Sequence, residues 1–136
     1  MKDLNPMMDE IITIEEYPAN LNIVHMLGKR MFLVAARDFV CIGYVTMNSS
    51  TGCIEKIGAS VEDSRCPPSS KFIRGEIKIS GLRLKPNSDG GSDILVLSMS
   101  DPKGSIPGFL KSGASKKQPE RIETALKAYY KKIGKQ

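Results

Sequence analysis

The sequence of 136 residues is long enough for one domain with one hydrophobic core. Its hydrophobic fraction of 40% is ordinary for a soluble protein, and its formal net charge of +5 favours anionic partners. The longest apolar run, Met31–Ala36, is far too short to span a bilayer, and the polar N-terminus lacks the apolar stretch of a signal peptide. We therefore expect a cytoplasmic protein whose contact with membranes is at most peripheral.

The cysteines and the histidine argue against a metal centre. Cys41, Cys53 and Cys66 match no CxxC spacing, and His25 is the only histidine of the sequence. Reduced thiols in the cytosol are the simplest interpretation of an odd number of widely spaced cysteines. We expect neither a metal nor a cofactor.

Seven segments have the composition of β-strands, rich in Val, Ile, Phe and Tyr and bounded by Gly, Pro, Asn or Asp. In chain order these segments are Asp9–Glu16, Leu21–Leu27, Asp38–Thr46, Cys53–Ser60, Phe72–Ser80, Leu82–Lys85 and Asp93–Ser100.

Loop and bend signals separate the later strands. Asp63–Ser70 contains Cys66-Pro67-Pro68 and must be a loop, because proline cannot serve a central ladder. Gly81 permits a bend between the fifth and sixth segments. Within Phe72–Ser80, alternation predicts that one face carries Ile73, Gly75, Ile77 and Ile79.

The C-terminal part of the sequence predicts helix. Ile106–Gly113 is expected to form a short helical turn, and Pro119 suits the first position of a helix that runs to about Ile133. The apolar residues of this helix recur at helical spacing and form a single stripe: Ile122, Leu126, Tyr129 and Ile133. The predicted fold class is α+β, a curved antiparallel sheet of six or seven strands packed on one long amphipathic helix.

The sequence offers few residues that could form a catalytic site. There is no GxSxG motif, no P-loop and no dinucleotide-binding fingerprint. His25 with Glu55 or Glu76 is the only acid-base pair that can be named, and a single histidine in a strand is more often structural. We expect a protein that is not an enzyme.

Three motifs in order carry a family resemblance. The first is Arg37-Asp38-Phe39-Val40 at the opening of a strand, and the second is Ile73-Arg74-Gly75 after a proline-containing loop. The third runs from Asp101 to Pro107 and contains Lys103 and Gly104, before the last helix. In this order the motifs resemble those of the START (steroidogenic-acute-regulatory-related lipid transfer) family, over about Asp9 to Ile133.

The resemblance implies a helix-grip fold, in which a U-shaped sheet wraps over a long C-terminal helix and encloses a tunnel for one lipid. Residues 1–136 would then form a single START-like lipid-binding domain, with the motif residues in structural roles. The tunnel and its lid would be lined by His25, Leu27, Met31, Phe32, Leu33, Ile57, Ile77, Phe109, Ile122, Leu126 and Tyr129.

The sequence departs from the family pattern in two ways. The family domain usually begins with a long helix, three strands and two further helices, so this chain resembles an N-terminally truncated or minimal form. A sheet without those strands has an exposed edge, which invites a partner or a second copy. Secondly, Gly43 stands where sterol-binding relatives place a buried arginine, and the acidic partner of that arginine falls near Met26.

The expected function is the binding, with or without intermembrane transfer, of a phospholipid, sterol or similar lipid. The alternatives are an interaction module that uses the exposed sheet edge, and a helix-grip enzyme that uses His25. Contact with an anionic membrane surface is expected from basic residues near the C-terminus: Lys116, Lys117, Lys127, Lys131 and Lys132. No nucleic-acid partner is expected.

Overall fold

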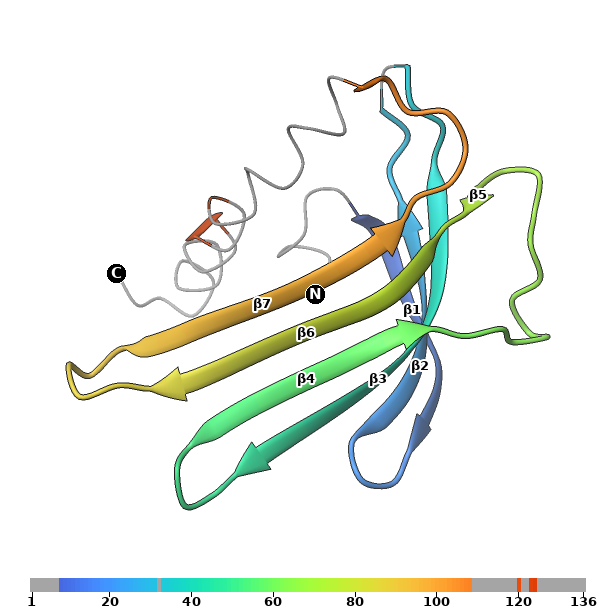
Figure 1. Ribbon diagram of the computed structural model, residues 1–136. Helices are drawn as coiled ribbons and strands as arrows, with labels where there is room; N and C mark the ends of the chain where they lie inside the picture. The colour runs from blue at the N-terminus through green and yellow to red at the C-terminus, as the bar shows by residue number, and fades with distance from the viewer. Residues whose placement is uncertain (1–7, 32, 109–119, 121–122, 125–136) are drawn as a thin grey trace.

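The chain folds into one curved sheet in a computed structural model that describes residues 8–31, 33–108, 120, 123 and 124 (Figure 1). The strands are β1 (Met8–Tyr17), β2 (Leu21–Gly28), β3 (Arg37–Asn48), β4 (Cys53–Ser60), β5 (Ile73–Arg74), β6 (Glu76–Pro86) and β7 (Ser92–Asp101). Their order in the sheet is β1-β2-β3-β4-β6-β7, and all these neighbours are antiparallel. The short strand β5 pairs in parallel with the start of β3.

The predicted strands and the loop at residues 63–70 are confirmed, with a correction around Gly75 and Gly81. The predicted strand Phe72–Ser80 is split, because Gly75 separates β5 from β6. The bend predicted at Gly81 is wrong: β6 continues to Pro86, since Gly81 is paired with Ile57 on one side and Leu97 on the other. A register shift between Ile77 and Ile79 interrupts the alternation of side chains along β6. The predicted placement of Ile73, Gly75, Ile77 and Ile79 on one face is therefore wrong.

The predicted C-terminal helix lies almost entirely outside the described residues. The same is true of Phe32, of most of the expected helical turn after Ile106, and of all five lysines expected at a membrane surface. Within the described part of the chain, no helix is long and apolar enough to cross a membrane.

The register divides the side chains between two faces, because directly paired residues in a sheet point to the same side. One face carries Asp38, Val40, Ile42 and Tyr44 of β3, and we call it the Tyr44 face. The other carries Phe39, Cys41 and Gly43, and we call it the Cys41 face. Apolar residues occupy both faces of β3, which is typical of a central strand.

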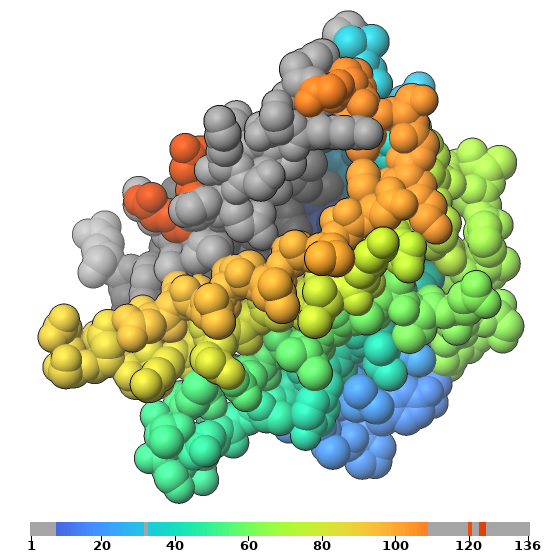
Figure 2. All heavy atoms as spheres, in the orientation of Figure 1, coloured from blue at the N-terminus to red at the C-terminus, as the bar shows by residue number. Residues whose placement is uncertain are grey.

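The buried residues gather at one place. Apart from the glycines, the buried ones among those described are Arg37, Asp38, Val40, Cys41 and Cys66, at the start of β3 and in the loop that follows β4. In contrast, all ten residues of β7 are exposed. In the space-filling view the yellow and orange atoms of β6 and β7 lie along the outside of the molecule (Figure 2).

Candidate functional site

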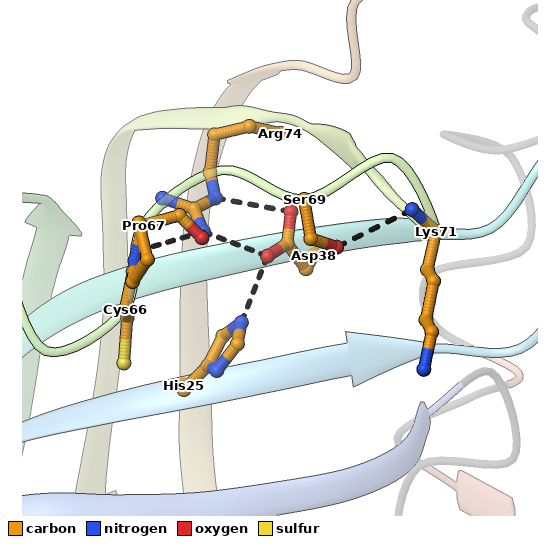
Figure 3. A network of polar contacts seen from close by, with 7 residues as sticks. All are labelled: His25, Asp38, Cys66, Pro67, Ser69, Lys71 and Arg74. Atoms are coloured by element: carbon orange, nitrogen blue, oxygen red, sulfur yellow. Dashed lines mark hydrogen bonds and ion pairs between the residues drawn. The ribbon is translucent and has the colours of Figure 1, made fainter.

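A network of charged groups surrounds the carboxylate of Asp38 (Figure 3). Arg74 donates to both oxygens of Asp38, from Nε to Oδ1 at 3.0 Å and from Nη2 to Oδ2 at 2.8 Å. His25 Nε2 lies 2.8 Å from Oδ2 of the same carboxylate. Arg74 Nη2 also donates to the carbonyl oxygen of Cys66 at 3.0 Å, which attaches the loop after β4 to the sheet. We call His25, Asp38 and Arg74 the Asp38 network.

The electrostatics of this network keep Asp38 ionised. Burial of the carboxylate alone would raise its pKa, but the hydrogen bonds from Arg74 and His25 outweigh burial and hold the pKa below its ordinary value. The hydrogen bond between Arg74 and Asp38 also raises the pKa of Arg74. A carboxylate with three donors and an exposed fraction of 1% is a satisfied buried ion pair.

The acid-base pairs expected for an enzyme are not assembled. Glu55 accepts a hydrogen bond from Arg83 at 2.6 Å, and Glu76 lies 3.6 Å from the ammonium of Lys103, whereas His25 is bonded to Asp38. His25 is thus held by a carboxylate that a guanidinium already neutralises. Among the described residues, no group of three His, Cys, Asp or Glu side chains lies close enough to hold a metal ion.

Arg37 joins the start of β3 to the segment after β7. Its guanidinium, in a residue 7% exposed, donates to the carbonyl oxygens of Ala35, Pro102, Lys103 and Ser105. Four carbonyl acceptors suit the planar fork of an arginine.

The glycines of the second and third motifs make room for these contacts. A Cβ atom on Gly75 would lie 2.3 Å from Cε1 of Phe39, so only glycine fits beside that ring. Gly104 has φ of +65°, and a Cβ there would lie 2.8 Å from Cδ1 of Ile73. The three motifs, 64 positions apart from Arg37 to Asp101, therefore meet at one point.

The remaining residues of the third motif shape its turn. The carboxylate of Asp101 accepts from the backbone N–H of Lys103 at 2.9 Å, and Lys103 itself has a left-handed φ of 49°. Pro107 is half-buried. Together with Arg37, Asp38, Phe39, Arg74, Gly75 and Gly104, these residues form what we call the motif cluster.

The side chains expected to contact lipid are spread over several places. His25, Leu27 and Ile57 lie on the Tyr44 face, where Ile57 is 57% exposed, and Ile77 is half-buried in β6. Met31 and Leu33 lie between β2 and β3, in a tight turn closed by hydrogen bonds between Met31 and Val34. Phe109, Ile122, Leu126 and Tyr129 are outside the described residues.

An apolar groove on the Tyr44 face was not predicted from the sequence. It has a volume of about 330 Å³ and is lined mainly by Leu21, Ile42, Tyr44, Ile57, Ala59 and Ile79. Its signal in the sequence was the apolar character of every second residue in β2, β3 and β4, which alone does not tell a groove from a packed core.

Gly43, which stands where sterol-binding relatives are expected to place a buried arginine, lies on the Cys41 face. A Cβ atom on Gly43 would lie 3.0 Å from Oδ1 of Asn22 and 3.8 Å from Cε of Lys56. Met26, paired with Phe39, lies on the same face. Two polar side chains from β2 and β4 thus flank a position without a side chain.

Comparisons with known proteins agree with this arrangement. A family model described as START domain matches residues 1–132. A curated relative, the homeobox-leucine zipper protein ATHB-14 of Arabidopsis thaliana, is 34% identical over 91 residues, which are 61% of this chain and 11% of that protein. The chain therefore spans about a tenth of this relative.

Solved structures share the fold at low sequence identity. Human STARD10 superposes with a TM-score of 0.83 at 19% identity, over 93% of this chain and 51% of that one. The lipid transfer and protein localization domain of human StarD13 superposes with a TM-score of 0.80 at 17% identity, over 93% of this chain and 64% of that one. The motif cluster, the curved sheet and the family match over residues 1–132 show that this chain belongs to the START domain family.

Proposed function

We propose that this protein binds a single lipid against the Cys41 face of its sheet. Membership of the START family carries the proposal, and solved relatives described as lipid transfer proteins support it. Polar catalytic chemistry has no support in the Asp38 network, because its carboxylate is fully paired.

The apolar character of the Cys41 face supports this location. The apolar residues of this face come from four strands and are all half-buried: Val24, Met26, Val45, Ile54, Leu82 and Leu84. A lipid leaves a bilayer only if protein surface replaces its lost apolar contacts, at roughly 25 cal/mol per Å². Such a face is the kind of wall that an acyl chain or sterol ring requires.

The polar side chains beside Gly43 support a place for the polar end of the lipid. Gly43 pairs directly with Gly58, and a Cβ atom on Gly43 would meet Oδ1 of Asn22 at 3.0 Å and Cε of Lys56 at 3.8 Å. We propose that Lys56 and Asn22 bind an anionic or hydroxyl-bearing head group there, since an ammonium and an amide offer donors to phosphate, carboxylate or hydroxyl oxygens.

The experiment compares the two faces. The protein is incubated with mixed lipids and bound lipid is measured by native mass spectrometry, for the wild type, Val45→Trp and Ile57→Trp. Val45 points to the Cys41 face and Ile57 to the Tyr44 face, so we expect Val45→Trp to lower lipid occupancy by roughly tenfold and Ile57→Trp to leave it unchanged. The reverse ranking would move the lipid to the face of His25, Leu27 and Ile57, and absence of bound lipid from the wild type would contradict the proposal.

The turn at Met31 and Leu33 is proposed to touch the membrane when lipid is exchanged. These side chains are 43% and 70% exposed, and the left-handed φ of 63° at Leu33 is an unusual conformation for a leucine. We expect Leu33→Asp to reduce co-sedimentation with phosphatidylcholine vesicles. An added requirement for anionic phospholipid would indicate that the C-terminal lysines take part.

A further inference from the structure

A row of polar and small residues crosses the Cys41 face from β1 to β7. Each residue of the row is directly paired with the next across the sheet, so all of them point to the same face. In order across the strands they are Glu16, Asn22, Gly43, Gly58, Ser80 and Ser98. None of them has an apolar side chain, and we call them the polar row.

The rows that follow on the same face, toward the β3–β4 turn, are apolar except for one lysine. The row next to the polar row consists of Val45, Lys56, Leu82 and Val96. The row beyond it consists of Met47, Ile54, Leu84 and Ile94. A lipid on this face therefore meets apolar side chains along these two rows and meets polar groups along the polar row and at Lys56.

Lys56 supplies a positive charge close to the polar row. Its Cε lies 3.8 Å from the position of a Cβ atom on Gly43, and Oδ1 of Asn22 lies 3.0 Å from the same position. Arg74 and Arg83 each form an ion pair, whereas among the described residues no carboxylate lies within ion-pair distance of Lys56. Its charge is therefore available to an anionic group of a ligand.

Ser80 supplies a hydroxyl on the other side of the two glycines. It pairs directly with Gly58 and is exposed, and no described residue forms a hydrogen bond with its hydroxyl. Ser60 of the same face differs, because its Oγ accepts a hydrogen bond from the backbone N–H of Ile77 at 2.8 Å. Ser80 therefore offers a donor that the described part of the chain does not use, and Ser60 does not.

We propose that the Ser80 hydroxyl donates a hydrogen bond to an acyl carbonyl of the lipid whose anionic head group lies at Lys56 and Asn22. This inference rests on the lipid binding proposed above and names the class of lipid. Lys56 and Ser80 are diagonal neighbours on β4 and β6, about 7–8 Å apart. The ligand thus has two separate polar centres, a phosphate and an ester or amide carbonyl.

An acylated phospholipid has both centres, and its acyl chains suit the two apolar rows. A sterol has a single hydroxyl and reaches only one of the two. An ether-linked phospholipid keeps the phosphate and the chains but lacks the carbonyl, so it isolates the contact made by Ser80.

Competition between ester and ether lipids tests this contact. The full 136-residue chain is incubated with equal amounts of a diacyl phosphatidylglycerol and its dialkyl ether analogue of the same chain length. Native mass spectrometry then gives the ratio of the two bound lipids. For one hydrogen bond we expect the wild type to favour the ester lipid about fivefold, and Ser80→Ala to bind the two lipids equally.

Two further variants separate the carbonyl contact from folding and from the head group. Ser60→Ala, which removes a hydroxyl already used within the chain, should keep the preference for the ester lipid. Lys56→Met should lower the occupancy of both lipids about tenfold and leave their ratio unchanged.

The outcomes distinguish this inference from the proposed function. Equal binding of both lipids by the wild type, or an unchanged preference in Ser80→Ala, would overturn the role of Ser80 while lipid binding itself stands. Preference for cholesterol over the diacyl lipid in the same assay would overturn the class of ligand. Absence of any bound lipid from the wild type would contradict the proposed function as well.

Discussion

The motif cluster and β7 reverse the usual distribution of polar and apolar residues. In the motif cluster the charged residues Arg37 and Asp38 are buried, at 7% and 1% exposure. In β7 the apolar residues Leu95, Leu97 and Met99 are more than half exposed. The polar groups of the first region are paired within the described residues, whereas the apolar side chains of the second are largely exposed.

The difference lies in how the polar groups are satisfied. Among the described residues, no buried side-chain nitrogen or oxygen lacks a hydrogen-bond partner, and the Asp38 network illustrates this. Among the strands that the structure describes, β7 is hydrogen-bonded only to β6. We infer that the motif cluster contributes more to the stability of the fold than β7 does.

The contribution of the motif cluster to stability is tested most directly by a substitution of Asp38. Asp38→Asn leaves the guanidinium of Arg74 without a balancing charge, and breaking a buried ion pair costs roughly 3 kcal/mol or more. We expect a loss of about 3 kcal/mol in the free energy of unfolding, measured by urea denaturation. Glu55→Gln, which disrupts the exposed pair with Arg83, is the control and should cost less than about 1 kcal/mol. Equal losses would show that the motif cluster is not the main source of stability.

Gly75 offers a second perturbation of the motif cluster. Gly75→Ala places a methyl group against the ring of Phe39 and should cost about 2 kcal/mol, a typical value for overpacking. In a Phe39→Leu background the cost should fall, which a double-mutant cycle measures. Gly81→Ala is the matched control, because a Cβ there would lie 3.5 Å from Cβ of Leu97 in ordinary contact. An unchanged cost in the Phe39→Leu background would rule out the ring as the cause.

Hydrogen exchange sharpens the β7 side of the comparison. Among the described strands β7 is hydrogen-bonded only to β6, and all its residues are exposed, whereas β3 is paired along its length on both sides. We expect the amides of β7 to exchange about tenfold faster than those of β3 in this chain, as measured by mass spectrometry of exchanged peptides. Equal exchange rates in the two strands would contradict this contrast.

Acid should act on the motif cluster, with the smallest of these effects. The pKa of Asp38 lies below its ordinary value of 3.8 in the folded protein, so its interactions stabilise the fold above that pH. This stability is lost as the pH falls through the lower folded-state value. We expect the difference in unfolding free energy between wild type and Asp38→Asn to shrink from about pH 5 to about pH 2, in urea titrations. A difference that stays constant over this range would show that the ionised carboxylate is not responsible.

The sequence by itself determined the strands and the family. Alternating β-branched and aromatic residues predicted β1 to β4 and β7 within a few positions, because such patterns are local. The three motifs identified the START family by order alone. The bend predicted at Gly81 was wrong because a glycine signal is also local, whereas β6 continues through Gly81 by pairing with β4 and β7.

Only the tertiary structure decided which residues meet and which faces they share. The contacts from Arg37 to the carbonyls of residues 102, 103 and 105, and the fit of Gly75 against Phe39, join segments far apart in the sequence. Composition could not place His25 beside Asp38, nor separate His25, Leu27 and Ile57 from Gly43 on the opposite face. Burial depends on every neighbour of a strand at once. β7 is exposed where it is the last of the described strands in the sheet, and no pattern within its ten residues expresses this.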